Sequence, residues 1–195
     1  MEKRKFGVLD VSAVGLGCMG FSHAYGAATE KNEAIHMIQE AVSVGYTFFD
    51  TAEIYGTPES PFGNEVLVGE ALKSCRDKVV IATKFGIRFD TSSGKVPYPI
   101  VTNSRPERIR ESVEGSLKRL QTNYIDLYFQ HRIDTDTPPE EVAGVMAELI
   151  KEGKIRAWGI SEATEDYLRR ANAVCPVAAV ENRYSMMARH YEPLF

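Results

Sequence analysis

Short apolar segments alternate with longer amphipathic segments along this chain. Six short segments indicate strands, and several are continuous apolar runs, which is typical of strands covered on both faces. They span residues 12–17, 46–50, 78–84, 124–130, 155–160 and 176–181. In the intervening stretches apolar residues recur every three or four positions, which predicts helices. Strand and helix alternate about six times, so the strands should be parallel and joined by right-handed crossovers.

Polar and small residues mark where these helices should begin and end. Thr29, Ser104 and Thr137 each precede an apolar-periodic stretch, and Ser104 forms a capping-box pattern with Glu107. Gly45 is expected to cap the C-terminus of the first helix. The two remaining helices are predicted over about residues 64–73 and 164–173.

Two architectures fit this alternation: a doubly wound open sheet and a (β/α)8 barrel. A dinucleotide-binding open sheet would carry G-x-G-x-x-G between its first strand and helix, and Gly15, Gly17 and Gly20 have that spacing. However, about eight further residues separate these glycines from the first helix, whereas a pyrophosphate needs the helix N-terminus directly after them. The barrel is favoured because polar residues close five of the apolar runs, and the carboxyl ends of barrel strands converge on one mouth. These residues are Asp50, Lys84, His131, Ser161 and Glu181.

Composition narrows the class of protein. The chain has 195 residues, of which 44% are hydrophobic, and a formal charge of -4. This length suits a single domain over residues 1–195 with its own core. The negative charge argues against a nucleic-acid partner, which usually requires a basic face. With three scattered cysteines, no apolar leader and no apolar run long enough for a membrane, we expect a cytoplasmic protein.

Four polar residues at the predicted mouth fit one reaction. Taken singly, a loop tyrosine, a charge at a strand end and a solvent-facing histidine are all ordinary features. Together, the four would face one another: Asp50, Tyr55, Lys84 and His131. A phenol has a pKa of about 10, but a lysine ammonium beside it lowers that pKa and a carboxylate can hold the lysine. A histidine across the pocket would orient a carbonyl oxygen, so the set suits proton donation to a carbonyl that receives a hydride from a nicotinamide.

Four segments also carry a resemblance to a known family: "FFDTAEIYG", "VVIATKFG", "YIDLYFQHRID" and "GISEAT". They resemble the aldo-keto reductases, and the likeness covers essentially the whole chain. The resemblance implies reduction of an aldehyde or ketone with NADPH, with Tyr55 as the proton donor and Lys84 as the neighbour that lowers its pKa. It further implies that Asp50 holds the lysine and that His131 orients the carbonyl. The first residues of the chain would form a β-hairpin that closes the N-terminal end of the barrel.

The same resemblance implies a set of contacts to the nicotinamide cofactor. The loop after the first barrel strand would pass near the nicotinamide ribose, and residues at the ends of the fifth and sixth strands would hold the carboxamide. The set is Gly20, Phe21, Asp50, Ser161, Glu162 and Glu181. Glu181 stands where the family usually has glutamine; an ionised glutamate cannot donate a hydrogen bond, so we expect weaker cofactor binding. The histidines lack metal-ligand spacing, and no metal site is expected.

The number of strands is a second departure from the family. Six barrel strands precede Phe195, whereas a (β/α)8 barrel of about 250 residues has eight. We therefore expect a barrel truncated after its sixth strand, with the open edges completed by a second chain or covered by self-association. Two functions stay open: a carbonyl reductase, or a non-catalytic remnant or regulatory subunit on the same scaffold. The polar segment 88–99 is expected to form a specificity loop at the mouth.

Overall fold

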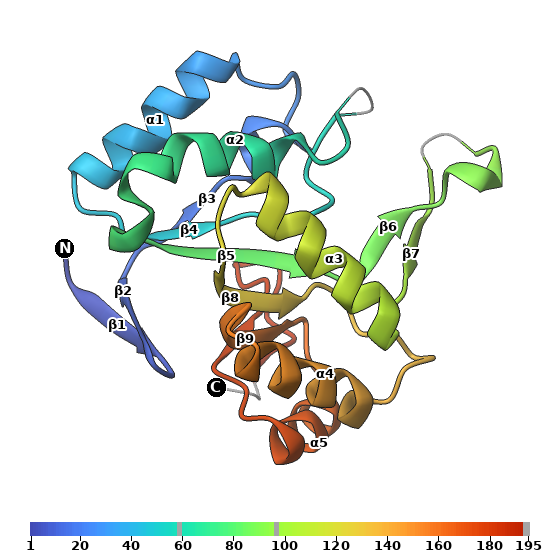
Figure 1. Ribbon diagram of the computed structural model, residues 1–195. Helices are drawn as coiled ribbons and strands as arrows, with labels where there is room; N and C mark the ends of the chain where they lie inside the picture. Colours follow the sequence, from blue (N-terminus) through green and yellow to red (C-terminus); the bar gives the residue numbers. More distant parts are fainter. Residues whose placement is uncertain (58–59, 96–97, 193–195) are drawn as a thin grey trace.

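The computed structural model describes residues 1–57, 60–95 and 98–192. Its centre is a six-stranded parallel sheet in the order β10-β9-β8-β5-β4-β3 (Figure 1). Each of the six predicted segments contributes one strand: β3 (Leu16–Gly17), β4 (Phe48–Asp50), β5 (Val80–Phe85), β8 (Ile125–Gln130), β9 (Ile155–Ser161) and β10 (Ala179–Glu181). Neighbours in the sheet are therefore also successive strands of this sheet along the chain.

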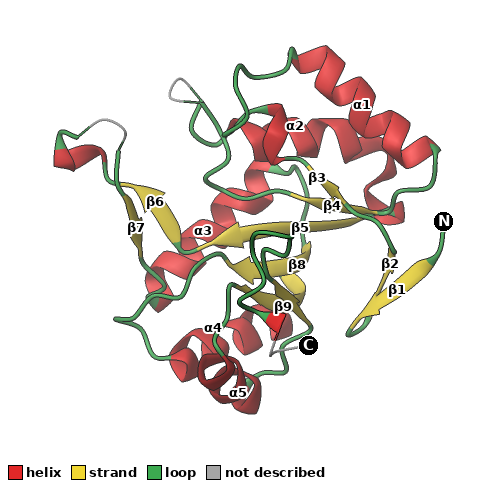
Figure 2. Cartoon of the chain, turned by 180° about the vertical axis from the view of Figure 1, so that it is seen from behind, coloured by secondary structure: helices red, strands yellow, loops and turns green. Residues whose placement is uncertain are grey.

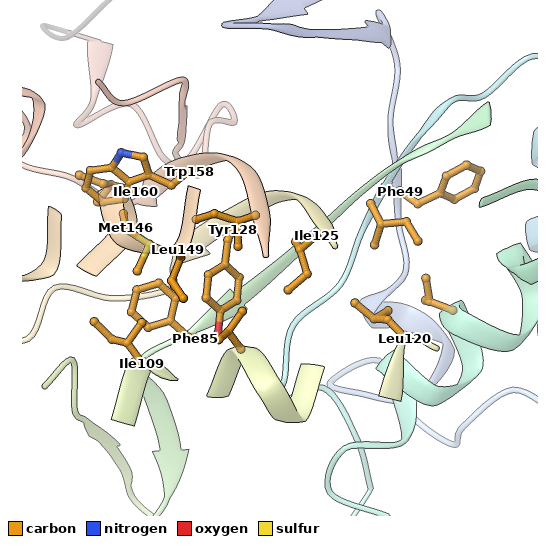
Figure 3. Close-up of a cluster of buried hydrophobic side chains, with 14 of the residues drawn as sticks. Phe49, Phe85, Ile109, Leu120, Ile125, Tyr128, Met146, Leu149, Trp158 and Ile160 are labelled. Atoms are coloured by element: carbon orange, nitrogen blue, oxygen red, sulfur yellow. The ribbon is translucent and has the colours of Figure 1, made fainter. Parts of the chain in front are cut away.

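The helices cover one face of this sheet. They are α1 (Lys31–Ser43), α2 (Gly63–Leu72), α3 (Pro106–Arg119), α4 (Pro139–Lys151) and α5 (Glu165–Val174). Their apolar faces and the strand residues that point toward them form an outer core, part of which Figure 3 shows around Phe85, Tyr128 and Trp158. Within the described residues, the inner core on the opposite face includes no side chain from these five helices. A doubly wound sheet has helices on both faces, so this one-sided arrangement favours the barrel architecture.

A β-hairpin closes the inner core at the amino ends of the strands. Strands β1 (Lys3–Phe6) and β2 (Leu9–Ser12) pair antiparallel, apart from the helical layer (Figure 2). Leu9 and Val11 are buried against inward-facing residues of β5, β8 and β9, including Val80 and Leu127. The hairpin implied by the family resemblance is confirmed.

The helix ends differ in part from the predicted caps. Gly45 has a left-handed backbone (φ 98°) directly after the first helix, and its N–H donates to Val42 O at 3.0 Å, as a C-terminal capping glycine should. The prediction for Thr29 is wrong, because Glu30 is the N-cap and accepts the N–H of Glu33. The predicted caps at Ser104 and Thr137 are also wrong. The Asp134 carboxylate accepts the Ser104 N–H at 2.7 Å and the Thr137 hydroxyl at 2.9 Å, which ties the two helix entrances together instead.

The predicted mouth loop over residues 88–99 is partly regular. A second hairpin, β6 (Ile87–Phe89) paired with β7 (Ile100–Thr102), projects from the end of β5, and residues 96–97 within it lie outside the described residues (Figure 1). Arg88 and Phe89, at the start of this segment, belong to β6, and the role of the segment in specificity stays a prediction. Among the described helices, none is both long and apolar enough to cross a membrane.

Candidate active site

The alternation of strand side chains carries polar groups to the mouth. Val80 and Ala82 of β5 belong to the inner core, and Lys84 is the next residue with the same orientation. Phe129 and His131 are related in the same way at the end of β8. By register, Asp50 pairs with Ala82 and Glu181 pairs with Ser161, so the predicted strand-end residues lie on the same face of the sheet.

Lys84 is the centre of the polar cluster. Its side chain is fully buried, and its ammonium is paired with the Asp50 carboxylate. The ammonium also donates to Thr51 O at 3.1 Å and lies 3.5 Å from Glu181 Oε1. Burial alone would lower the pKa of Lys84, but Asp50, Glu181 and Tyr55 outweigh it and raise the pKa above its usual value. The lysine is therefore a fixed positive charge.

The loop after β4 holds Tyr55 over this charge. The Tyr55 N–H donates to Ala52 O at 3.1 Å, and Tyr55 O accepts the N–H of Asn64 at 2.9 Å. The Lys84 ammonium lies 5.3 Å from the centre of the phenol ring. The two hydrogen bonds hold the backbone of Tyr55 on both sides and thereby fix the position of its phenol ring.

The pKa of the Tyr55 phenol is raised, which corrects one prediction. Burial is the largest cause, and Asp50 and Glu181 add to it, while Lys84 lowers the pKa as expected. The expected net lowering is wrong because burial and two carboxylates exceed the effect of one ammonium. The phenol consequently holds its proton at neutral pH, which a proton donor requires.

His131 faces the phenol across the mouth. Its ring centre is 5.6 Å from that of Tyr55, with the planes nearly perpendicular. Its backbone N–H donates to Phe85 O at 2.8 Å, which fixes the residue after β8. Burial, with Lys84 and Arg132 nearby, lowers the pKa of His131 to about 3. The imidazole is therefore neutral, and its buried Nδ1 has no hydrogen-bond partner among the described residues.

The residues expected to contact the cofactor divide into two groups. Ser161 and Glu181 lie at the mouth, where the Ser161 hydroxyl accepts from Arg132 Nη1 at 3.2 Å and Glu181 faces Lys84. Gly20 is exposed on the turn that follows β3. The structure does not bring the side chain of Phe21 to the mouth, because it is buried in the outer core.

Glu162 is held by hydrogen bonds at the end of β9, and its role as a cofactor contact stays a prediction. It has a left-handed backbone (φ 56°), and its carboxylate accepts the Arg183 N–H at 2.9 Å and the Tyr191 hydroxyl at 2.8 Å. Its N–H donates to Glu181 O at 2.9 Å. In this arrangement Glu162 joins the end of β9 to the segment after β10.

Comparison with known proteins agrees with this geometry. The family model for the aldo/keto reductase family matches residues 13–195. The chain belongs to the aldo/keto reductase family. It is 45% identical over 184 residues to probable aldo-keto reductase 1 of Glycine max, covering 94% of this chain and 51% of that protein.

Solved structures of aldo/keto reductases superpose on nearly the whole chain. The holo form of AKR11C1 from Bacillus halodurans has a TM-score of 0.83 and 34% identity, over 99% of this chain and 61% of its own. The glycerol dehydrogenase AKR11B4 from Gluconobacter oxydans has a TM-score of 0.83 and 31% identity, over 99% and 58%. The predicted barrel-type α/β fold is thus confirmed, and the chain spans about half to three-fifths of these relatives.

Sequence reasoning missed two side chains of this aldo/keto reductase mouth. His23 stacks on Tyr55 with ring centres 5.6 Å apart, and its Nδ1 lies 3.2 Å from Gly56 O. Arg132 bridges His131 O and the Ser161 hydroxyl. His23 carried no signal because it stands six residues beyond the end of a two-residue strand. Arg132 did carry a signal in the sequence, because it directly follows His131, a predicted site residue.

The mouth of this reductase-family chain fits a polar, planar ligand group. Among the described residues, four of the buried polar atoms without a hydrogen-bond partner belong to residues at the carboxyl ends of β4, β8 and β10: Asp50 Oδ2, His131 Nδ1 and both amide atoms of Asn182. Buried polar atoms of this kind are costly unless something pairs with them. A nicotinamide carboxamide and a carbonyl oxygen offer the donors and acceptors that these atoms lack.

Proposed function

We propose that this chain carries the carbonyl-reducing site of an NADPH-dependent oxidoreductase acting on aldehydes or ketones. The observation that carries the proposal is the buried Lys84–Asp50 pair beneath Tyr55, with a neutral His131 facing the phenol. Membership of the aldo/keto reductase family supports it, as does the match to a holo reductase structure. Turnover in the cytoplasm is part of the same proposal.

The chain's own residues would handle the oxygen and the proton. A bound nicotinamide supplies the hydride. Neutral His131 donates a hydrogen bond to the carbonyl oxygen and orients it, and Tyr55 gives its phenolic proton to that oxygen as negative charge develops there. Lys84 stabilises the phenolate left behind, and Asp50 holds the ammonium in place.

The proposed cofactor contacts differ in how well the positions of the residues support them. We propose that Ser161, Glu181 and the exposed Gly20 contact the nicotinamide end of the cofactor, together with Asp50. The proposal of Phe21 is restricted to its backbone, since its side chain is in the outer core. Glu162 is proposed as a contact through the acceptor sites of its carboxylate that the Arg183 N–H and the Tyr191 hydroxyl leave unused.

Reduction of a panel of aromatic and aliphatic aldehydes, followed by NADPH absorbance, tests the proposal. Tyr55→Phe keeps the ring that packs against His23 and His131 and removes only the hydroxyl. We expect kcat to fall by about 10²–10⁴-fold, the usual contribution of a general acid, with NADPH affinity by fluorescence titration unchanged.

An equal loss of NADPH binding and turnover in Tyr55→Phe would assign the tyrosine to binding rather than proton transfer. Absence of turnover in both proteins would instead favour the non-catalytic or regulatory alternative on the same scaffold.

A further inference from the structure

Two carboxylates compete for one buried ammonium at the mouth. Asp50 at the end of β4 and Glu181 at the end of β10 both reach Lys84, although β5, β8 and β9 lie between their strands in the sheet. They meet because the sheet is rolled and its inward-facing side chains converge at the carboxyl ends. Glu181 Oε1 lies 3.5 Å from the ammonium, close enough for a direct ionic interaction.

The charge balance of this cluster depends on one proton. With both carboxyls ionised, two negative charges face the one positive charge of Lys84. Burial and the charge of Asp50 raise the pKa of Glu181 to about 7, and burial also raises that of Asp50. Carboxyls this close titrate as a coupled pair, and protonation of one makes the set neutral. The charged or titratable groups that face Glu181 are Asp50, Lys84, Tyr55 and Arg132.

The protonation state of the Glu181 carboxyl affects the phenolic proton of Tyr55 through Lys84. The Lys84 ammonium stabilises negative charge on the Tyr55 oxygen. An ionised Glu181 repels negative charge on that oxygen, and it also pairs with the same ammonium. A neutral Glu181 leaves the ammonium to Asp50 and Tyr55. A neutral carboxyl can additionally donate a hydrogen bond to a carboxamide oxygen, which a carboxylate cannot.

We propose that Glu181 is a positioning residue that acts through Lys84: its neutral form permits proton donation by Tyr55, and its ionised form opposes it. This inference rests on the proposed function. It makes the carbonyl-reducing activity of this chain depend on pH in a way that a glutamine at residue 181 would not.

The test compares Glu181→Gln, which has the shape of the neutral acid, with the unmodified protein. Between about pH 6 and pH 8.5 we expect kcat/KM for aldehyde reduction to fall about tenfold or more in the unmodified protein and less than about threefold in Glu181→Gln. Glu165→Gln is the matched control, because Glu165 is an exposed carboxylate at the start of α5 that pairs with Arg169. It should keep the unmodified pH profile.

A second readout needs no cofactor and no turnover. In isotope-labelled protein, the side-chain carboxyl resonance that Glu181→Gln removes should titrate near neutral pH, and the Lys84 ammonium resonance should shift over the same range. In Glu181→Gln the Lys84 resonance should not shift there. A Glu181 resonance that titrates at about 4.5, the ordinary range for glutamate, would overturn the inference, as would identical pH profiles in the two proteins.

The outcomes separate this inference from the proposed function. If neither protein reduces aldehydes, the proposed function fails. The inference about reduction fails with it, even if the two resonances still titrate together. If both proteins reduce aldehydes with one pH profile, the proposed function stands and the inference alone is overturned.

Discussion

A buried glutamate lies within the connector that joins Asp50 to Tyr55. The side chain of Glu53 is 3% exposed, Arg108 Nη2 is 3.8 Å from its Oε2, and its Oε1 has no partner among the described residues. Its N–H donates to Lys84 O at 3.2 Å, so the same residue supports the strand that carries Lys84. Burial raises the pKa of Glu53 to about 7, although Arg108 opposes the rise.

This pKa predicts how the stability of the protein depends on pH. The carboxyl binds its proton more tightly in the folded chain than in the unfolded chain, whose value is 4.5. The free energy of unfolding therefore falls as the pH rises from that value to about 7, and the loss is complete above it. Glu53→Gln removes the group that must be ionised, so we expect it to stabilise the protein by about 1–3 kcal/mol near pH 8 and little near pH 5.

Urea unfolding at the two pH values measures the difference. Glu40→Gln, at an exposed position of α1, serves as the comparison and should change neither value appreciably. A Glu53→Gln protein that is less stable at both values would show that the carboxylate is a needed partner of Arg108.

Helices α2 and α3 approach each other at a glycine. A Cβ on Gly69 would lie 2.7 Å from the backbone of Leu120, at the end of α3. Backbone cannot yield as a flexible side chain can, so this contact requires the smallest residue. Gly144 in α4 differs, because a Cβ there would meet nothing within 4 Å.

The two glycines should respond to alanine with opposite signs. Gly69→Ala should destabilise the protein by about 1–3 kcal/mol through overpacking between the helices. Gly144→Ala should stabilise it by up to about 1 kcal/mol, because alanine has the higher helix propensity. Thermal unfolding of both variants checks the pair. A stabilised Gly69→Ala would mean that α2 and α3 can separate freely.

Two hydrophobic cores of the described residues lie on opposite faces of one sheet. The hairpin β1–β2 completes the inner core, while Trp158 lies in the outer core and donates its indole N–H to Cys175 O at 3.3 Å. Since strands β5, β8 and β9 contribute to both cores, a substitution that destabilises one core should also destabilise the other.

A substitution in the hairpin tests this coupling. Val11 is 1% exposed and Val8 is 81% exposed. Val11→Ala should lower the free energy of unfolding by about 1–3 kcal/mol, equally by Trp158 fluorescence and by far-ultraviolet circular dichroism. Val8→Ala should leave both transitions in place. Separate transitions for the two signals in Val11→Ala would show that the hairpin unfolds alone.

The pattern of apolar residues predicted the strands because strand periodicity and burial are local properties. It also predicted that Asp50, Lys84, His131 and Glu181 share a mouth, since parallel strands end together. The direction in which the pKa of Tyr55 shifts could not be predicted from sequence, because it depends on the balance between burial and three nearby charges. The contacts of Phe21 and Glu162 could not be predicted either, because turns and left-handed residues decide which way their side chains point.

The order of the strands has a consequence for how the polypeptide is made. Strands β3, β4, β5, β8, β9 and β10 lie in the sheet in the order of synthesis, so each new strand finds its partner already in place. At ribosomal rates of about 5–20 residues per second, successive strands emerge on the order of seconds apart, which is slow compared with hairpin and helix formation. The sheet can thus grow from one edge as the nascent chain leaves the ribosome, with Lys84 meeting Asp50 well before Glu181 has been translated.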